Sequence, residues 1–497
     1  VENIKRNSMS YLGIDIGTSS IKVSLINAQQ QLLATKSINI PIQRPNPLYS
    51  EQNPEDWWNA VVTAIDYLQN NYANQWQNLK SIGITGQQHG AVCLDKNGAV
   101  VYPAILWNDG RSYQEAQFLN SNYADFLHIN GNLVLPGFTA PKIFWLQKHK
   151  PEIYQQVSTI LLPKDYIRYR LTGEYASDLS DASGTSWLDV KNRKWSEKLL
   201  QICQLDISYM PKLYEGTAIS GYLHSNLQHA WGIKNSVTVV GGGGDNAAGA
   251  VSVGVICHGK AMLSLGTSGV YFIAQDSYLP MDNGISHSFC HCIPQMWHHM
   301  GVILSAASCL SWLSLISSKA EHELIANAQT QRYDADATPL FLPYLSGERT
   351  PHNNPFARGM FFGITHTTQL KDLTNAVLEG VAYAIKDCEE ILPNTKQVES
   401  LAIIGGGAKS NYWGQIIANV LNKTIVFYDE TKIGPSFGAA LLALAGDNGI
   451  NVSDLEINPL IIKEINPQPQ LINFYLQKHE KFKALYQQTK NLNNLNL

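Results

Sequence analysis

Near its start the chain reads Gly13-Ile14-Asp15-Ile16-Gly17-Thr18-Ser19-Ser20-Ile21-Lys22-Val23, and near its middle it reads Met262-Leu263-Ser264-Leu265-Gly266-Thr267-Ser268-Gly269-Val270-Tyr271-Phe272. Each stretch is an apolar strand, a Gly-Thr-Ser turn and a second apolar strand, and the two lie about half the chain length apart. A match of this length at this spacing indicates an internal repeat. We therefore expect two halves that share one fold.

The segments after the two turns follow a similar order. In the first half we expect a strand over residues 32–36, a helix that begins after Asn53, and a buried strand over residues 79–85. Asn53 is a good N-cap, and Pro54 suits the first helical position. In the second half we expect strands near 261–274, 286–293 and 297–303, a helix near 305–317, a long helix through Val377, Val381, Ile385 and Cys388, and a strand over 401–404.

Strands that alternate with helices in both halves predict an α/β protein of two similar domains. We place the boundary near residue 255, so that the domains span residues 11–255 and 256–497 and residues 1–10 form a polar extension. Because ligand pockets are common between domains, we expect the active site in the cleft between the halves.

The composition excludes several classes of protein. The chain has 497 residues and a formal net charge of −4, which leaves no basic surplus for nucleic acid. Its seven cysteines have no framework spacing, which indicates reduced thiols. No apolar run reaches the about 18 residues of a membrane helix, and the start lacks the apolar segment of a signal peptide. We expect a cytoplasmic protein that binds neither nucleic acid nor membrane.

The glycine turns have the composition of phosphate-binding sites. Small residues between two strands leave backbone N–H groups free to converge on an anion, and hydroxyl groups add donors. Alone, any such turn could be an ordinary hairpin; three together favour a nucleotide. The donors would come from Gly17, Thr18 and Ser19, from Gly266, Thr267 and Ser268, and from a third run, Gly405, Gly406, Gly407 and Ala408, which follows a strand and precedes a helix.

Two aspartates stand beside these turns. Asp15 lies inside an apolar strand, where a carboxylate needs a partner such as the Mg²⁺ that accompanies a nucleotide. The alternative is a hydrogen-bonded structural aspartate. Asp245 follows four glycines, Gly241–Gly244, at a predicted helix start. Glycines there would let backbone approach a small substrate, with Asp245 as the general base.

Other nucleotide-binding motifs fit less well. Gly242, Gly244 and Ala247 match a dinucleotide-binding pattern, but Asp245 would then repel the pyrophosphate. The chain contains no P-loop motif and no protein-kinase motif set. An aspartate near its usual pKa of about 3.9 is ionised at neutral pH, which suffices for phosphoryl transfer to a hydroxyl.

Gln88 and His89 follow the buried strand over residues 79–85, at the end where α/β proteins bind ligands. Their amide and imidazole groups would hydrogen-bond sugar hydroxyls without adding charge, although His89 alone could be structural. The histidine and cysteine run over 287–292 could hold zinc, but no second cysteine pair completes such a site.

At this point the chain resembles the FGGY carbohydrate kinases. Two family signatures are present, Gly137-Phe138-Thr139-Ala140-Pro141-Lys142-Ile143-Phe144-Trp145-Leu146 and a second that runs from Gly359-Met360-Phe361-Phe362-Gly363-Ile364 to Ala376-Val377-Leu378-Glu379. The resemblance implies an actin-like, ribonuclease-H-like ATPase fold in each half. Stretches such as Leu345-Ser346-Gly347-Glu348-Arg349-Thr350-Pro351-His352 are most similar to members that phosphorylate D-xylulose.

The resemblance also implies roles for individual residues. Asp245 would be the catalytic base, with Gln88, His89 and Asn246 at the sugar. Asp15 would position Mg²⁺ and share the catalytic role. ATP would bind the three glycine turns, with Lys22 beside the first turn, Asn411 near the adenine and Trp312 at the nucleotide. Similar bacterial enzymes often carry Met in place of Gln88, and glycerol kinases carry a charged Arg-Glu pair in place of Gln88 and His89.

The expected reaction is ATP-dependent phosphorylation of D-xylulose to D-xylulose 5-phosphate. The rivals are a sibling kinase for another ketose or polyol, such as L-ribulose, a non-catalytic sugar sensor that binds ATP, and a dehydrogenase, which absence of NAD binding would remove. A sensor needs no base, so the presence of Asp15, Asp245 and all three turns argues against it. The expected partners are the sugar and MgATP, and a homodimer is the assembly we consider.

Overall fold

A computed structural model describes residues 9–329 and 338–492. Residues 1–8 of the expected extension lie outside the described part, and the first strand begins at Ser10. The fold contains two large sheets of seven strands each, one per half. The first consists of β1 (Ser10–Ile16), β2 (Ser20–Asn27), β3 (Leu32–Asn39), β5 (Leu79–Gly86), β13 (Ile219–Tyr222), β14 (Thr238–Val240) and β15 (Gly243–Gly244).

The second sheet repeats the pairing of the first. It consists of β16 (Ala261–Leu265), β17 (Gly269–Gln275), β18 (His287–Cys290), β19 (Trp297–Ile303), β22 (Ser400–Ile404), β23 (Thr424–Tyr428) and β24 (Ile461–Ile465). β1 pairs antiparallel with β2 and parallel with β5, just as β16 pairs antiparallel with β17 and parallel with β22. The repeat read from the sequence is therefore a repeat of topology, and the α/β fold class is confirmed.

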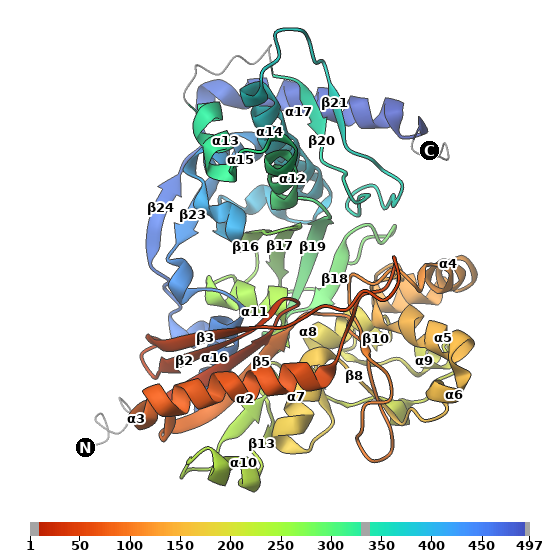
Figure 1. Cartoon of the computed structure of the whole chain (residues 1–497), viewed down its shortest axis with the longest axis vertical. Helices are drawn as coiled ribbons and strands as arrows, with labels where there is room; N and C mark the ends of the chain where they lie inside the picture. Colours follow the sequence, from red (N-terminus) through yellow and green to blue (C-terminus); the bar gives the residue numbers. More distant parts are fainter. Residues whose placement is uncertain (1–8, 330–337, 493–497) are drawn as a thin grey trace.

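Helices cover the sheets. In the first half these include α2 (Pro54–Asn71), α4 (Tyr113–Asn122), α5 (Thr139–His149), α7 (Pro163–Thr172), α8 (Leu179–Ala182) and α11 (Asp245–Ser252); in the second half they include α12 (Ala307–Ser317), α13 (Glu321–Gln329), α14 (Leu370–Ile391), α15 (Asn411–Leu421), α16 (Pro435–Asn448) and α17 (Pro469–Thr489). As predicted, Asn53 caps α2 by accepting a hydrogen bond from the Glu55 N–H. Figure 1 shows α2 along the first sheet and α12, α13 and α14 gathered over the second.

A large insertion between β5 and β14 builds a third packed region. Its main helices, α4 and α5, surround an apolar core that includes Phe126, Ile143 and Trp187. Two further helices of the insertion, α7 and α8, carry charged and hydroxyl side chains that are fully buried. The insertion thus brings polar groups next to the end of the first sheet, where the expected sugar site lies.

One helix of the second half packs on the sheet of the first. α16 lies against β1 and β5 and beside α11, between the two sheets (Figure 1). The approach is close enough that a Cβ on Gly13 would stand 1.7 Å from the Ser436 carbonyl oxygen. The domain boundary near residue 255 stays a prediction. It divides the sequence, but α16, which belongs to the second half of the sequence, packs on the sheet formed by the first half.

Within the described residues, no helix combines the length and the apolar character needed to cross a membrane. The long helices instead carry one buried face. In α14, for example, Val377, Val381, Ile385 and Cys388 are all buried, as their helical spacing predicted.

Candidate active site

Strand register brings the predicted aspartates to one edge of the first sheet. Asp15 of β1 pairs with Thr85 of β5, and Thr85 pairs with Gly243 of β15. All three strands are parallel, so their carboxyl ends meet at the same edge. The turn after β1, the Gln88–His89 segment after β5 and Asp245 after β15 therefore converge from three distant parts of the sequence.

Asp245 is the first residue of α11, as predicted. Its Oδ1 accepts hydrogen bonds from the Asn246 backbone N–H at 2.7 Å and from the Asn246 side-chain amide at 3.0 Å. Burial raises the pKa of Asp245 to about 6, and the two bonds from Asn246 oppose this rise. The expectation of an ordinary aspartate pKa was wrong, because the site is less hydrated than the sequence indicates. The carboxylate is still mostly ionised at pH 7 and above.

Asp15 has an orphaned oxygen. Its Oδ1 is buried and accepts no hydrogen bond from any described residue. Burial and the negative charge of Asp245 raise the pKa of Asp15 to about 8, while Lys22, its partner in β2, lowers it. A hard divalent cation is a suitable partner for such an oxygen, so the residues fit the expected Mg²⁺.

His89 is held in a defined orientation. Its Nδ1 lies 2.8 Å from the Gly184 carbonyl oxygen, and its ring stacks on Phe138 at 4.4 Å. Because a carbonyl only accepts, Nδ1 carries the proton and Nε2 remains an acceptor. Burial lowers the pKa of His89 to about 3, so the ring is neutral. Phe138 belongs to the first family signature, and Lys142 of the same signature donates to the His89 carbonyl at 2.8 Å.

The Gln88 side chain packs against Gly244, the last glycine before Asp245. Its Nε2 donates to the Ser180 carbonyl at 3.3 Å. A Cβ on Gly244 would stand 2.5 Å from this Nε2, so only glycine permits the contact. The glycines therefore serve close packing of Gln88 against the backbone that presents Asp245.

A cavity of about 200 Å³ is lined by Gln88, His89 and Asp245, and Asp15 is not among its described lining residues. It brings together residues of both halves, as the cleft prediction requires. Sequence reasoning named six of its lining residues as site residues: Gln88, His89, Asp245, Asn246, Gly266 and Ser268. It assigned no role to Trp107, Ser264, Val270, His287, Met300, Val302 and Arg349, which also line the cavity. Most of these lie in strands whose apolar pattern gives no sign of a site.

The first glycine turn is tied to the cavity wall. Trp107 Nε1 donates to the Thr18 hydroxyl at 3.0 Å, and that hydroxyl donates to Gln87 Oε1 at 3.2 Å. The Thr18 hydroxyl therefore positions the turn, while Gly17 is half-buried and Ser19 is exposed beside it. We expected the Thr18 hydroxyl to donate to phosphate, but in the structure it already donates to Gln87.

The second and third glycine turns lie side by side. A Cβ on Gly405 would stand 2.8 Å from the Leu265 carbonyl, directly before Gly266. The Thr267 side chain is exposed, and the Thr267 carbonyl accepts from Ala306 N–H at 2.9 Å near the start of α12. Gly406 has open space around it, and Gly407 packs on Leu265. Two of the three expected phosphate-binding segments thus share one wall, with residue 408 following in the same turn.

Of the expected nucleotide residues, Gly266 and Ser268 line the cavity, whereas others, such as Trp312 and Asn411, are not among its described lining residues. Trp312 stacks on Phe341 at 6.1 Å and on Phe361 at 6.3 Å, half-buried against the core of the second half. Asn411 is exposed at the first position of α15. Their roles at the nucleotide stay predictions.

Comparison with known proteins decides the family. The family model described as the FGGY family of carbohydrate kinases, N-terminal domain, matches residues 10–252, and the corresponding C-terminal model matches residues 261–446. The chain belongs to the FGGY family of carbohydrate kinases. As a member of this family it uses ATP and a sugar as substrates.

Individual relatives of this FGGY kinase match nearly the whole chain. The xylulose kinase of Escherichia coli (strain K12) is 47% identical over 482 residues, which are 96% of this chain and 99% of the relative. The xylulose kinase of Klebsiella pneumoniae is 44% identical and covers 97% of this chain and 99% of its own. Among solved structures, a "xyloylose kinase" from Brucella ovis superposes with a TM-score of 0.93 at 42% identity, covering 97% of this chain and 100% of that one.

A buried ionic network supports the sugar site of this FGGY kinase. Lys164 contacts Asp165 at 2.6 Å and Asp178 at 2.8 Å, and all three are fully buried. Asp178 accepts from the Ser180 hydroxyl at 2.5 Å, and that hydroxyl accepts from the Gly244 N–H at 3.0 Å. A chain of polar contacts therefore runs from α7 to the residue before Asp245. The sequence gives no sign of these contacts, because they connect residues of α7 and α8 to β15, which lies far from both along the chain.

The same network reaches the glycine run at a second point. Arg168 Nη2 donates to the Gly241 carbonyl. Burial raises the pKa of Asp181 well above its ordinary value, while the charge of Lys164 opposes this rise. Lys164 and Arg168 therefore lie among three buried acids, Asp165, Asp178 and Asp181, and these contacts hold the side chains next to the glycine run.

The histidine and cysteine run of this FGGY kinase makes local contacts, including one between Cys292 Sγ and His291 Nδ1 at 3.5 Å. His291 Nε2 lies 3.2 Å from the Val255 carbonyl, and Cys290 Sγ lies 3.5 Å from the Val190 carbonyl. In the described residues, the group spaced to hold a metal is instead Asp387, Glu390 and His479. Within that group His479 Nε2 contacts Asp387 Oδ1 at 2.7 Å, as an ion pair does.

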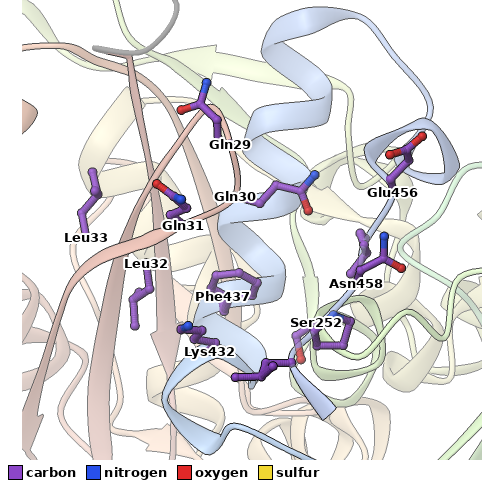
Figure 2. Close-up of a pocket in the computed structure, with 13 residues that line it drawn as sticks. Gln29, Gln30, Gln31, Leu32, Leu33, Ser252, Lys432, Phe437, Glu456 and Asn458 are labelled. Atoms are coloured by element: carbon purple, nitrogen blue, oxygen red, sulfur yellow. The ribbon is translucent and has the colours of Figure 1, made fainter.

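A larger cavity, of about 510 Å³, opens elsewhere in the molecule. Figure 2 shows Gln30 reaching from the turn between β2 and β3 toward the segment of Glu456 and Asn458. Gln30 Nε2 donates to the Leu455 carbonyl and so bridges the two segments. Among its described lining residues there is none that the sequence predicted at the active site.

Proposed function

We propose that the chain transfers the γ-phosphate of ATP to the terminal hydroxyl of D-xylulose, giving ADP and D-xylulose 5-phosphate. The observation that carries the proposal is the 47% identity to a xylulose kinase over 96% of the chain. The cavity supports it, since it is small, joins both halves and contains a buried carboxylate.

Asp245 is the proposed base. The hydroxyl oxygen forms a bond to the γ-phosphorus, the bond from that phosphorus to the bridging oxygen breaks, and the hydroxyl proton passes to Asp245. The transition state is loose and needs only modest base strength. A carboxylate with a pKa of about 6 meets that need and remains ionised at neutral pH.

The remaining roles follow from position. His89 Nε2, Gln88 and Asn246 would hold the sugar hydroxyls, because all three residues line the cavity. The turns at Gly17 and Gly266 would hold the terminal phosphates, and the run at Gly405 the α-phosphate. Asp15 would hold Mg²⁺, whose chemistry is to neutralise charge on the phosphates. Lys22, Trp312 and Asn411 complete the proposed nucleotide site.

A panel of sugars tests the substrate. ADP release would be measured with D-xylulose, L-ribulose, D-gluconate and glycerol at equal concentrations. We expect the highest kcat/KM with D-xylulose. A higher kcat/KM with any other sugar would replace the proposed substrate within the same family, and no ADP release with any sugar would contradict the proposed reaction.

Three further proposals accompany this function. The seven free cysteines support a cytoplasmic location. The homodimer can be tested by light scattering on the eluting protein. The domain boundary near residue 255 can be tested by limited proteolysis, which should cut near it when the sites are empty.

A further inference from the structure

We propose that Arg349 binds the carbonyl oxygen of the ketose, and that this contact makes the enzyme prefer ketoses to alditols. The inference deepens the proposed function and rests on it, because it concerns the same cavity and the same sugar. It identifies a specificity-determining residue that comes from the second half of the chain.

Arg349 faces the sugar residues from across the cleft. It lines the cavity together with Gln88, His89 and Asp245, which belong to the first half. Burial lowers the pKa values of His89 and His287, so both rings are neutral. Arg349 is therefore the one cation among the described residues that line this cavity.

The guanidinium has little to bind within the protein. Its Nη1 lies 3.4 Å from His287 Nε2, a long contact in which the ring accepts. No carboxylate of the described residues lies within ion-pair distance of it. The neighbouring Glu348 is turned to the backbone, where its Oε1 accepts from Leu304 N–H at 2.9 Å and from Arg349 N–H at 2.7 Å.

Glu348 also supplies little charge. It is only 2% exposed, and burial raises its pKa to about 8, so that it is mostly protonated at neutral pH. Burial lowers the pKa of Arg349 to about 10, and the charge of Glu348 offsets this only in part, so the buried cation is incompletely neutralised and costly. A bound ligand that accepts hydrogen bonds from the Arg349 N–H groups would offset this cost.

The cavity is otherwise rich in acceptors. Asp245 accepts through its carboxylate, and His89 accepts through Nε2. One of the two side-chain amide hydrogens of Gln88 donates to the Ser180 carbonyl, and one of those of Asn246 donates to Asp245. Sugar hydroxyls can rotate to donate to these acceptors, but a carbonyl oxygen only accepts. Among the described residues that line the cavity, Arg349 is the charged donor with N–H groups to spare for a carbonyl oxygen, and the neutral His287 ring offers one further N–H at its unpartnered Nδ1.

This contact distinguishes a ketose from its alditol. Reduction of the carbonyl gives a hydroxyl whose own hydrogen needs an acceptor. It also makes the planar carbonyl carbon tetrahedral, so the oxygen no longer lies in the plane of its neighbours, where it would accept best from the guanidinium. A hydrogen bond to a charged group is worth about 1.5–3 kcal/mol, or roughly 10–150-fold in affinity. We expect a preference of that order for the ketose.

The test compares D-xylulose with xylitol and D-arabinitol, the two alditols that its reduction gives. Sugar binding would be measured by calorimetry without nucleotide, and kcat/KM would be measured by ADP release. The variants are Arg349→Leu, which removes the donors, and Arg349→Lys, which keeps the charge without the fork. Arg358→Leu is the control, because Arg358 is exposed and, among the described residues, donates to the Pro355 and Ala357 carbonyls alone.

In Arg349→Leu we expect affinity for D-xylulose to fall roughly 10–150-fold while affinity for the alditols changes little, so that the preference disappears. Arg349→Lys should lie between, and Arg358→Leu should match the wild type. If Arg349→Leu lowered the affinity or kcat/KM equally for the ketose and the alditols, the inference would be overturned. An arginine that binds phosphate would lower kcat/KM for all three sugars in this way. An unchanged preference in Arg349→Lys and Arg349→Leu would also overturn the inference.

The two failures are distinguishable. If the wild-type chain does not phosphorylate D-xylulose, the proposed function fails. If it does and the ketose preference survives the loss of Arg349, only the inference fails. Arg349→Lys guards against misfolding, since it preserves the cation and most of the side-chain volume. Its thermal unfolding would be compared with that of Arg358→Leu.

Discussion

The negative charge of Asp245 raises the pKa of Asp15, although the two residues come from opposite ends of the first half of the chain. They meet because β1, β5 and β15 run parallel and in register. Two carboxylates that share a desolvated site repel each other, and a cation relieves that repulsion. The arrangement brings the proposed base and the proposed metal ligand together at one edge of the first sheet.

Replacement of the proposed base should abolish most turnover. We expect Asp245→Asn to lower kcat by a factor on the order of 10²–10⁴, the usual contribution of a general base, while D-xylulose and ATP still bind. The amide has the same size but cannot accept the proton. ADP release gives kcat and calorimetry gives the affinities. Near-normal turnover would remove Asp245 from the mechanism.

The acid limb of the pH profile should report Asp245. Because its pKa is raised to about 6 and the base must be ionised, kcat/KM should fall as the pH drops below about 6. Asn246→Ala removes the side-chain hydrogen bond that stabilises the carboxylate, so the limb should move to higher pH. The measurement is kcat/KM for D-xylulose from pH 4.5 to about 8. A limb that stays in place in this variant would show that another group controls it.

Loss of Asp15 should harm the use of MgATP more than sugar binding. In Asp15→Ala we expect a raised KM for MgATP and a lower kcat, with nearly unchanged affinity for D-xylulose. The orphaned Oδ1 beside the first turn is the reason. A titration of Mg²⁺ at fixed ATP measures the effect. A collapse of sugar affinity with intact ATP use would contradict the proposed role.

The same substitution should also alter stability. The pKa of Asp15 is raised from 3.8 to about 8 in the folded protein, so the fold holds a proton that the unfolded chain releases. The free energy of unfolding due to Asp15 is therefore greatest below about pH 4 and declines as the pH rises toward about 8. In the absence of nucleotide, the melting temperature of Asp15→Ala minus that of the wild type should therefore be larger at pH 8 than at pH 5. A constant difference would contradict the raised pKa.

The buried network should matter for turnover as well as for folding. Ser180→Ala leaves the Gly244 N–H without its partner, which should cost about 1–3 kcal/mol of stability. Displacement of Asp245 should lower kcat by up to about 100-fold with little change in the KM for MgATP. The matched control is Ser177→Ala, because Ser177 Oγ is buried and makes no hydrogen bond to a described residue. Equal effects in both variants would show a merely structural role.

Sugar and nucleotide should bind cooperatively. The cavity takes lining residues from both halves, so each ligand favours closure of the cleft and helps the other. Such coupling is typically about 1–3 kcal/mol and is reciprocal. Calorimetry with a non-hydrolysable ATP analogue, with and without D-xylulose, measures it, and small-angle scattering should show contraction with both ligands. Independent affinities and an unchanged radius would indicate a rigid site.

Much of the fold could be read from local patterns. The twin Gly-Thr-Ser turns predicted two related sheets, and Asn53 with Pro54 predicted the start of α2. The turn residues, caps and apolar periods act within a few positions of themselves, so their consequences are visible in sequence order. The placement of Asp245 at a helix start was predicted for the same reason.

Only the tertiary structure decided how these pieces meet. Arg349 reaches the cavity of Gln88 and His89 from the other half, and Ser180 supports Gly244 from an insertion. The pKa of Asp245 rises because folding removes water from around it, which no neighbouring residue in the sequence reveals. Proximity and desolvation depend on the whole packed molecule, whereas turns, caps and strand patterns are properties of a short stretch of chain.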